Sequence, residues 1–464
     1  MANNLWKTGV LCVLSLGVLA SAANAGGFSR GEADTDILFE EGSVAARAGV
    51  IYVSPERQYE TIKGVAATDA AYSNSFWIPS FAAKFKLADN LACALTYTQP
   101  FGADATYGPQ AQAAGASIHK EFVSNEFGAT CDVNMEAGKG RVHFLGGVFM
   151  QDFSYLAQSR AGTLHLDDHS AFGYRFGVAY DITEYALRAQ LMYRSKVEHD
   201  ADDGSFDWNP ALLPFGTRDA YGSGTLPQSL KLSLQSGIAP GWLVYGSVKW
   251  TDWSVLDRLN YSIFSPAAVP ALGLAAGYNN RTDIYNWKDG WTLQAGVAHA
   301  FTENVSGTVN LTWDSGVSTG ADIVTDSWTV GAGALIKAGP GELRVGGAVT
   351  YLTSGSQAVA DQALYNATAG GDWSYAVSGS YPSSSDETGL PVFHDARNKK
   401  ARFVRAFLRW VQCGSLVFVT NLQQSGYRRW RPCDPANLSI SRHKLGAAVS
   451  RRKLGYVLRN SSFE

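Results

Sequence analysis

Near its end the chain reads Gly371-Gly-Asp-Trp-Ser-Tyr-Ala-Val-Ser-Gly-Ser-Tyr-Pro-Ser-Ser-Ser385. From Trp373 to Tyr381, large, apolar or glycine residues alternate with serine and alanine. Because successive side chains of a strand point to opposite faces, this period of two predicts a strand with an aromatic face and a small polar face. A soluble sandwich would bury its large residues and expose many charges, so the pattern favours an aromatic face toward lipid and a small face toward a lumen.

The same alternation recurs in the chain before this stretch. Fourteen segments carry it, at residues 45–53, 76–87, 91–101, 121–133, 141–153, 171–181, 185–197, 228–238, 242–253, 288–300, 303–314, 326–337, 341–352 and 371–381. The whole chain has 464 residues, of which 48 are glycine, 12% are aromatic and only 17% are charged. This composition and length favour one large membrane barrel over several soluble domains.

The connections between these segments alternate in length. Short ones occupy 88–90, 136–140, 182–184, 239–241, 301–302 and 338–340, and long ones occupy 54–75, 102–120, 154–170, 198–227, 254–287, 315–325 and 353–370. Tight turns then gather at one end of an antiparallel barrel and long loops at the other, as in bacterial outer-membrane barrels. We therefore expect an all-β protein: a 14-stranded antiparallel transmembrane β-barrel over residues 45–382, with a short N-terminal hatch at residues 26–44 inside the lumen.

Both ends of the chain differ from this barrel. Residues 1–25 have a basic start, an apolar run and small residues before Gly26, which predicts an export signal peptide cleaved after Ala25. Residues 383–464 hold 15 Lys/Arg against 5 Asp/Glu and do not alternate. We interpret this basic, non-barrel tail either as a periplasmic or surface segment or as the product of a reading-frame shift or fusion in the gene.

Five short motifs lie in order on this fourteen-strand frame. They are Tyr97-Thr-Gln-Pro-Phe-Gly-Ala-Asp-Ala-Thr-Tyr107, Tyr193-Arg-Ser-Lys-Val197, Leu226-Pro-Gln-Ser-Leu230, Trp250-Thr-Asp-Trp-Ser254 and Trp287-Lys-Asp-Gly-Trp291. Over about residues 26–382 the chain thereby resembles the FadL/TodX (OMPP1) family of outer-membrane transporters for hydrophobic compounds. The resemblance implies a monomeric protein in the outer membrane of a Gram-negative cell, placed there by the barrel assembly machinery.

The resemblance also implies uptake of long-chain fatty acids or related hydrophobic molecules. The solute would be captured at external loops, passed to an apolar site at the mature N-terminus, and released sideways through a gap in the wall where the third strand kinks. An aromatic-hydrocarbon channel and a general diffusion porin for small solutes are the alternatives. Long loops rich in Ala, Leu, Pro and aromatic residues favour greasy ligands over the solutes of a porin.

The candidate kink is the stretch Gln99-Pro-Phe-Gly102. Pro100 cannot donate a ladder hydrogen bond and Gly102 tolerates unusual dihedral angles, so the strand either bulges or ends there. In the hatch, the candidate ligand-binding residues are Phe28, Ile37, Leu38 and Phe39. The hatch lacks the Asn-Pro-Ala element that the family carries before its first strand, and it is shorter.

A fatty acid requires a cation for its carboxylate, because an unpaired charge in an apolar pocket is costly. Arg281 and Lys288 are favoured for this role, since they border the long connection 254–287. Further arginines at inward strand positions are Arg47, Arg175, Arg188, Arg194 and Arg344. These arginines either serve the ligand or pair with lumen acids such as Asp132 and Asp181.

Cys93 and Cys131 take outward positions on adjacent strands, nearly opposite one another. In an oxidising compartment they either form a cross-strand disulfide or remain two lipid-facing thiols. Gly316-Val-Ser-Thr-Gly320 matches a nucleophile motif, but it lies in a connection rather than between a strand and a helix. We expect no enzyme activity, with an outer-membrane lipase as the best enzymatic alternative, and no metal site, cofactor or nucleic-acid partner.

Overall fold

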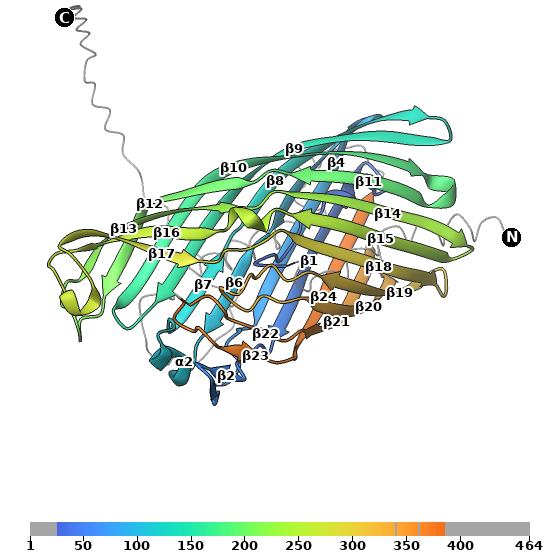
Figure 1. Ribbon diagram of the computed structural model, residues 1–464. Helices are drawn as coiled ribbons and strands as arrows, with labels where there is room; N and C mark the ends of the chain where they lie inside the picture. The colour runs from blue at the N-terminus through green and yellow to red at the C-terminus, as the bar shows by residue number, and fades with distance from the viewer. Residues whose placement is uncertain (1–25, 339–340, 361, 386–464) are drawn as a thin grey trace, which may run out of the picture. The chain divides into compact units, whose positions relative to one another are not determined.

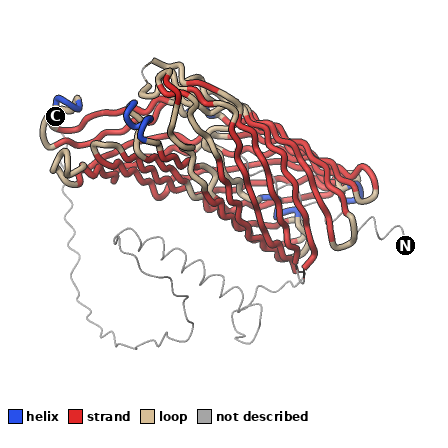
Figure 2. Tube along the Cα trace, turned by 90° about the horizontal axis from the view of Figure 1, so that it is seen from below, coloured by secondary structure: helices blue, strands red, loops and turns tan. Residues whose placement is uncertain are grey.

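The computed structural model describes residues 26–338, 341–360 and 362–385 (Figure 1). Twenty of the described strands form one antiparallel sheet that closes on itself, because β1 (Val44–Pro55) pairs with both β4 (Phe76–Ala88) and β24 (Asp372–Ser385). Figure 2 shows the strands of this wall side by side along the barrel. The predicted signal peptide and all but the first residues of the predicted tail lie outside the described residues.

Fourteen strands cross the wall, and six of them are divided by short breaks. In order they are β1; β4; β5 (Leu91–Thr98) with β6 (Gly102–Thr106); β7 (His119–Val123) with β8 (Glu126–Ala137); β9 (Gly140–Gln158); β10 (Gly162–Ile182); β11 (Leu187–Arg194) with β12 (Val197–Trp208); β13 (Thr217–Leu226) with β14 (Ser229–Ala239); β15 (Trp242–Thr251) with β16 (Arg258–Ser265); β17 (Gly277–Ile284) with β18 (Gly290–Ala300); β19 (Val305–Asp314); β20 (Ser327–Ala338); β21 (Gly341–Leu352); and β24. The predicted fourteen-stranded antiparallel barrel is confirmed.

The closing strand β24 places its side chains as the alternation predicts. Trp373 and Tyr375 are 47% and 44% exposed on the outer face, whereas Ser374 between them is 1% exposed. The strand continues to Ser385, beyond the predicted end of the barrel at residue 382, and its Pro382 lies opposite Arg47 of β1. Large side chains exposed on the outer face suit a wall that is surrounded by lipid.

At the end of the barrel that carries α2 and β2, the alternation is inverted (Figure 1). In β12, Val197, Phe206 and Trp208 are buried, while the acidic residues Glu198 and Asp207 are exposed. An apolar inner face and a charged outer face are typical of a sheet in water, so β12 extends beyond the lipid.

Three predicted long loops are therefore wrong. Residues 154–170 and 198–227 are largely strand, in the hairpins β9–β10 and β12–β13, and about half of 254–287 is strand, in the hairpin β16–β17. The alternation that predicts a wall strand places aromatic residues on the outer face. Strands that leave the membrane carry their large residues on the inner face, so the same pattern does not detect them.

Short elements pack together at the same end of the barrel. They are a second sheet of β2 (Thr61–Ile62), β3 (Val65–Ala66), β22 (Gly355–Ser356) and β23 (Thr368–Ala369), together with α2 (Pro109–Ala114). Buried Arg57 ties the connections there by donating to the carbonyl oxygens of Thr353 and Gly370 and to the Asp372 carboxylate. Within the residues described, no helix has the length and apolar character to cross a membrane.

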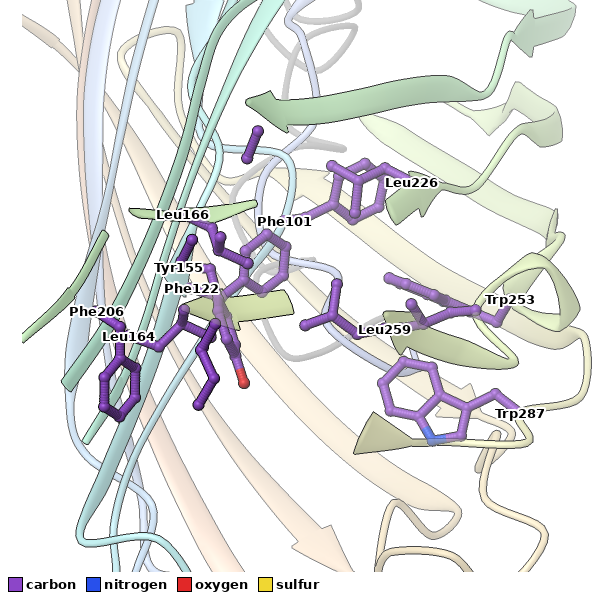
Figure 3. Close-up of a cluster of buried hydrophobic side chains, with 14 of the residues drawn as sticks. Phe101, Phe122, Tyr155, Leu164, Leu166, Phe206, Leu226, Trp253, Leu259 and Trp287 are labelled. Atoms are coloured by element: carbon purple, nitrogen blue, oxygen red, sulfur yellow. The ribbon is translucent and has the colours of Figure 1, made fainter. Parts of the chain in front are cut away.

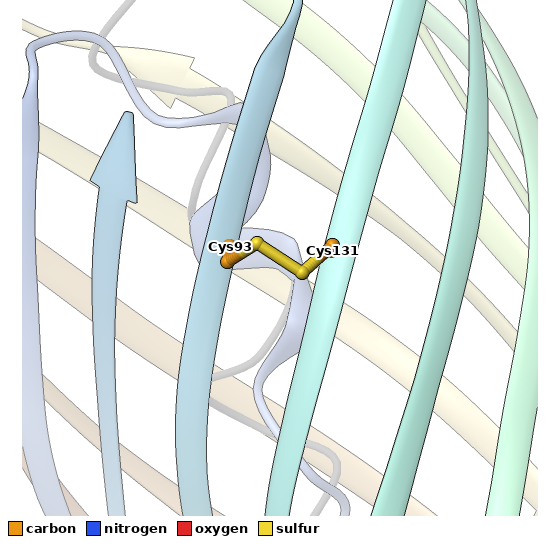
Figure 4. The surroundings of a disulfide bond; sticks show 2 residues. All are labelled: Cys93 and Cys131. Atoms are coloured by element: carbon orange, nitrogen blue, oxygen red, sulfur yellow. A yellow bond between two sulfur atoms is a disulfide. The ribbon is translucent and has the colours of Figure 1, made fainter. Parts of the chain in front are cut away.

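A disulfide joins Cys93 of β5 to Cys131 of β8 (Figure 4). The two residues lie directly opposite each other in the antiparallel register. Both share the outward phase of exposed neighbours such as Leu95 and Phe127. The bond therefore links the third and fourth wall strands on their outer face.

The double substitution Cys93→Ser with Cys131→Ser is expected to lower the free energy of unfolding by about 2–4 kcal/mol, because it releases a cross-link that restricts the unfolded chain. The bond closes a loop with a sequence separation of 38 residues. Urea unfolding in detergent, followed by the heat-modifiable gel mobility of barrels, measures the change. Replacing Cys413 and Cys433 by serine serves as the control, since it leaves the bonded pair intact.

Candidate functional site

A gap in hydrogen bonding, which we call the wall window, separates β4 from the third wall strand. β4 pairs with β5 only from Phe81, opposite Tyr97, onward, although residues 76–80 keep their ladder to β1. At the far side of the window, the Asn74 N–H donates to the Asp104 carbonyl at 3.0 Å. The window is thus bounded by paired backbone at both ends.

The third strand is itself broken beside the window, at residues 99–101 between β5 and β6. The predicted kink residues Pro100 and Gly102 lie at this break, and the strand resumes as β6 rather than ending there. The neighbouring strand is broken at residues 124–125, between β7 and β8. Two adjacent wall strands therefore change course at one level, while the function of the break as a lateral gate remains a prediction.

The N-terminal segment 28–31 occupies the window. The Arg30 N–H donates to the Pro100 carbonyl, the Gly31 N–H to the Gln99 carbonyl and the Gly102 N–H to the Phe28 carbonyl, each at 2.8 Å. A Cβ on Gly102 would lie 2.6 Å from the Arg30 guanidinium, so a larger residue at this position would displace the Arg30 side chain. The segment adds a short strand to the broken edge and closes it.

Arg30 carries a buried charge into the window. Its guanidinium lies 4.0 Å from the centre of the Phe76 ring, and Nε and Nη2 have no hydrogen-bond partner among the described residues. An arginine side chain remains protonated at neutral pH, so Arg30 carries a positive charge here. An unpartnered buried cation favours an anionic group at this place.

Phe28 packs against a buried cluster rich in aromatic residues, which we call the aromatic cluster; Figure 3 shows its members Phe122, Trp253 and Trp287. The ring centroid of Phe28 lies 4.6 Å from Trp287, 5.3 Å from Phe122, 5.7 Å from Tyr285 and 6.2 Å from Trp253. Trp253 is fully buried and also contacts Phe101 at 5.4 Å between ring centroids. The Trp287 indole donates to Asp322 at 2.8 Å, and burial raises the pKa of that carboxyl to about 6.

One cavity, which we call the outer pocket, lies among the strands that extend beyond the lipid. Its volume is about 210 Å³. Its apolar lining includes Leu164, Phe206, Trp208, Ile263 and Leu274, all members of the aromatic cluster. Its polar lining includes Lys120, whose ammonium lies 2.7 Å from the Asp283 carboxylate, and the predicted residue Arg281. The predicted Lys288 is exposed and lines neither this pocket nor the lumen cavity.

The lumen cavity has a volume of about 560 Å³ and lies against residues 29–41 of the N-terminal segment. Phe39, a predicted ligand contact, lines it and lies 4.4 Å from the Arg188 guanidinium. The other two predicted contacts in this part, Ile37 and Leu38, are buried against alanines of the wall and do not line the cavity. Their packing fixes the segment to the wall.

Ion pairs hold the N-terminal segment in the lumen. Asp34 lies 2.6 Å from Arg47, Glu40 contacts Arg47 and Arg344, Asp36 lies 3.5 Å from Arg188, and Glu32 lies 2.6 Å from Lys231 and 2.9 Å from Lys249. Arg175 and Arg194 instead share the buried carboxylate of Glu126. The lumen arginines thus pair with acids, but with different acids from those that the sequence analysis suggested.

The acids suggested for the arginines have another partner. Asp132 and Asp181 hold His143 between them, at 2.9 and 2.6 Å from its two ring nitrogens. The signal that the sequence analysis missed is the acidic run Glu32, Asp34, Asp36 and Glu40, which pairs with inward cations of five different strands. Acidic residues in a predicted hatch indicate the partners of lysine and arginine side chains that point into the lumen.

Arg47→Met is expected to loosen the segment by about 3–5 kcal/mol, because it leaves buried Asp34 without its cation. Glu32→Gln is the matched comparison and should cost only about 0–1 kcal/mol, since the Glu32 side chain is half exposed to the lumen. The urea concentration at which residues 26–43 become accessible to protease measures both. Equal effects of the two substitutions would contradict this assignment.

One known protein family matches more than half of this chain. A family profile described as outer membrane protein transport protein (OMPP1/FadL/TodX) matches residues 20–307. Outer membrane protein P1 of Haemophilus influenzae is 31% identical over 150 residues, which cover 31% of this chain and 32% of that protein. The long-chain fatty acid transport protein of Escherichia coli O6:H1 is 28% identical over 153 residues, or 28% of this chain and 33% of that protein. The chain thus aligns with about a third of the length of these curated relatives.

Solved structures share the fold over much more of the chain. A FadL homologue of Pseudomonas aeruginosa superposes with a TM-score of 0.56 at 13% identity, over 79% of this chain and 99% of that one. The toluene transporter TbuX of Ralstonia pickettii superposes with a TM-score of 0.53 at 11% identity, over 80% of this chain and 100% of that one.

Proposed function

The chain belongs to the outer membrane protein transport protein family (OMPP1/FadL/TodX), and on that premise we propose that it takes up hydrophobic molecules and releases them sideways through the barrel wall. The observation that carries the proposal is the wall window, a bounded gap in the ladder that the backbone of residues 28–31 fills. A lateral exit delivers an apolar solute into lipid without passage through water, which is where such a solute is most stable.

The aromatic cluster supports a continuous apolar route to the window. Its outer members Leu164 and Phe206 line the outer pocket, and its inner member Phe101 lines the lumen cavity. Phe28 lies between these two ends and is part of the segment that closes the window. Capture would occur in the outer pocket, and displacement of Phe28 would accompany release.

Long-chain fatty acids are the favoured substrates. One relative is named a long-chain fatty acid transport protein, and the buried, unpartnered guanidinium of Arg30 provides a cation for a carboxylate beside the exit. Aromatic hydrocarbons are the second candidate, because a cluster lined by Trp253, Trp287 and Phe122 suits flat apolar rings and a structural neighbour is a toluene transporter.

A diffusion porin is disfavoured by the ion-paired N-terminal segment in the lumen. Members of the family are transporters and channels by name, and we propose that this chain likewise acts without catalysis. We also propose that it works as a monomer and that the barrel assembly machinery inserts it in the outer membrane.

Uptake by cells that lack their own transporter tests the proposal. Cells that express residues 1–385 or the full chain are given labelled oleate or labelled toluene, and the purified protein is placed in a planar bilayer. We expect oleate uptake above the background of empty cells and no steady ion conductance. Uptake of toluene alone would move the substrate to aromatic hydrocarbons, and steady conductance without uptake would establish a porin.

A further inference from the structure

Two lysines lie directly opposite each other on neighbouring strands of the wall. Lys231 of β14 is paired in register with Lys249 of β15, and both side chains line the lumen cavity. Like charges that face each other across two strands repel, so an anion beside them stabilises the pair. Their ammonium groups lie 2.6 and 2.9 Å from the two different carboxylate oxygens of Glu32. We call Lys231 and Lys249 the dilysine clamp.

The anion in the dilysine clamp belongs to the N-terminal segment. Among the residues that the structure describes, Glu32 is the only acid that forms an ion pair with either lysine. Its side chain is 48% exposed and lines the lumen cavity, whereas the Asp34 side chain in the same segment is 9% exposed beside Arg47. Glu32 is therefore held by charge rather than by packing, and another carboxylate in the cavity can compete for its place.

Glu32 also connects two sides of the barrel. The residue before it, Gly31, donates its N–H to the Gln99 carbonyl at the break in the third wall strand. The dilysine clamp belongs to the eighth and ninth wall strands, on the other side of the lumen. The contact of Glu32 with the clamp therefore ties the segment that fills the wall window to the opposite wall, and loss of this contact frees one end of that segment.

The lumen cavity offers both parts of a binding site for an amphiphile. Its apolar lining includes Ile51, Ile78, Phe101 and Met192, which provide surface for a hydrocarbon chain. The dilysine clamp provides two ammonium groups, and a carboxylate accepts strong, charge-assisted hydrogen bonds from such groups. A neutral hydrocarbon or an alcohol has no charge with which to compete against Glu32.

We propose that the dilysine clamp binds the carboxylate of an acidic amphiphile, and that Glu32 occupies the clamp as an internal competitor until that amphiphile arrives. The inference rests on the proposed uptake of hydrophobic molecules and distinguishes acids from neutral solutes among them. A carboxylate that enters the lumen cavity replaces Glu32, so one ion pair is exchanged for another in the clamp. The N-terminal segment then loses its tie to the opposite wall, whereas a neutral solute leaves that tie in place.

Equilibrium binding of radiolabelled decanoate to the purified full-length protein tests this inference without any transport step. An internal competitor weakens the apparent affinity in proportion to the fraction of time that it leaves the site free. Glu32→Gln removes the competitor and is expected to bind decanoate about tenfold more tightly than the wild type, which corresponds to a clamp that is free about a tenth of the time. Decanol has the same hydrocarbon chain without the charge, so its affinity should be equal in both proteins. If Glu32 were only structural, its loss would instead weaken the binding of both ligands.

Two further variants, both made in the Glu32→Gln protein, locate the effect in the clamp. Adding Lys249→Met removes half of the dilysine clamp and should return the decanoate affinity to the wild-type value or below. Adding Lys337→Met removes a different lysine that lines the lumen cavity, and the tight binding should persist. Heat-modifiable gel mobility verifies that each variant barrel is folded.

Release of the N-terminal segment is measured separately. Decanoate should lower the urea concentration at which residues 26–43 of the wild type become accessible to protease, and decanol should not. The inference is overturned if Glu32→Gln binds decanoate no more tightly than the wild type, if decanol gains affinity equally, or if Lys249→Met leaves the tight binding intact. Because these measurements involve no uptake, failure of the proposed transport would appear only in the cell assay and is distinguishable from failure of the clamp.

Discussion

Trp253→Ala is expected to lower the free energy of unfolding by about 3–5 kcal/mol, as truncation of a fully buried tryptophan does. Trp253 has no exposed surface, and its ring contacts Phe28, Phe101 and Trp287. The substitution leaves a cavity where the aromatic cluster meets the N-terminal segment. Uptake of hydrophobic solute should fall with stability, because the cluster no longer holds Phe28 beside the window.

Trp373→Ala is the matched control, since it removes the same side chain from the lipid-facing side of β24, where Trp373 is 47% exposed. We expect a change of about 1 kcal/mol or less, in keeping with substitutions outside a packed core. Urea unfolding of both variants in the same detergent gives the comparison. Equal losses would show that the aromatic cluster is not the packed core described here.

Glu126→Gln is the second substitution with a large expected effect, again about 3–5 kcal/mol. Glu126 is 2% exposed, contacts Arg175, and lies 2.7 Å from Arg194. The amide leaves the buried guanidinium of Arg175 and the partly buried one of Arg194 without this counter-charge at the start of β8, directly after the break in the fourth strand. The loss should therefore appear first as instability around the wall window.

Glu184→Gln provides the control, because Glu184 is an exposed acid in a tight turn. A change within about 0.5 kcal/mol is expected there. If Glu126→Gln were equally mild, the two arginines would have to be neutralised by something other than Glu126, and the charge assignment of the lumen would be wrong.

Much of the fold could be predicted from the sequence because the membrane imposes one pattern. Outward aromatic residues in β24, such as Trp373 and Tyr375, leave no other face for Ser374 than the lumen. The pattern fails where the wall leaves the lipid. In β12 the large residues Phe206 and Trp208 face inward, and a search for lipid-facing residues reads that stretch as a loop.

The candidate site could be predicted only in part. Pro100 and Gly102 marked the break in the third strand through their own backbone chemistry, independently of the rest of the chain. The partner of that break could not be found in the same way, because residues 28–31 reach it from far away in the sequence. Likewise, nothing local indicates that Arg47 pairs with Asp34, since the pairing depends on how the N-terminal segment lies in the lumen.

Locking the window closed tests the central claim most directly. Ser29 and Phe101 face each other in an isolated antiparallel bridge, so Ser29→Cys with Phe101→Cys offers a disulfide between the N-terminal segment and the broken strand. Wild type and Phe101→Cys are carried through the same oxidation and reduction, because reductant also opens the native bond. We predict that the oxidised double variant takes up no more oleate than empty cells and regains uptake on reduction. Undiminished uptake by the fully cross-linked protein would contradict lateral release through this window.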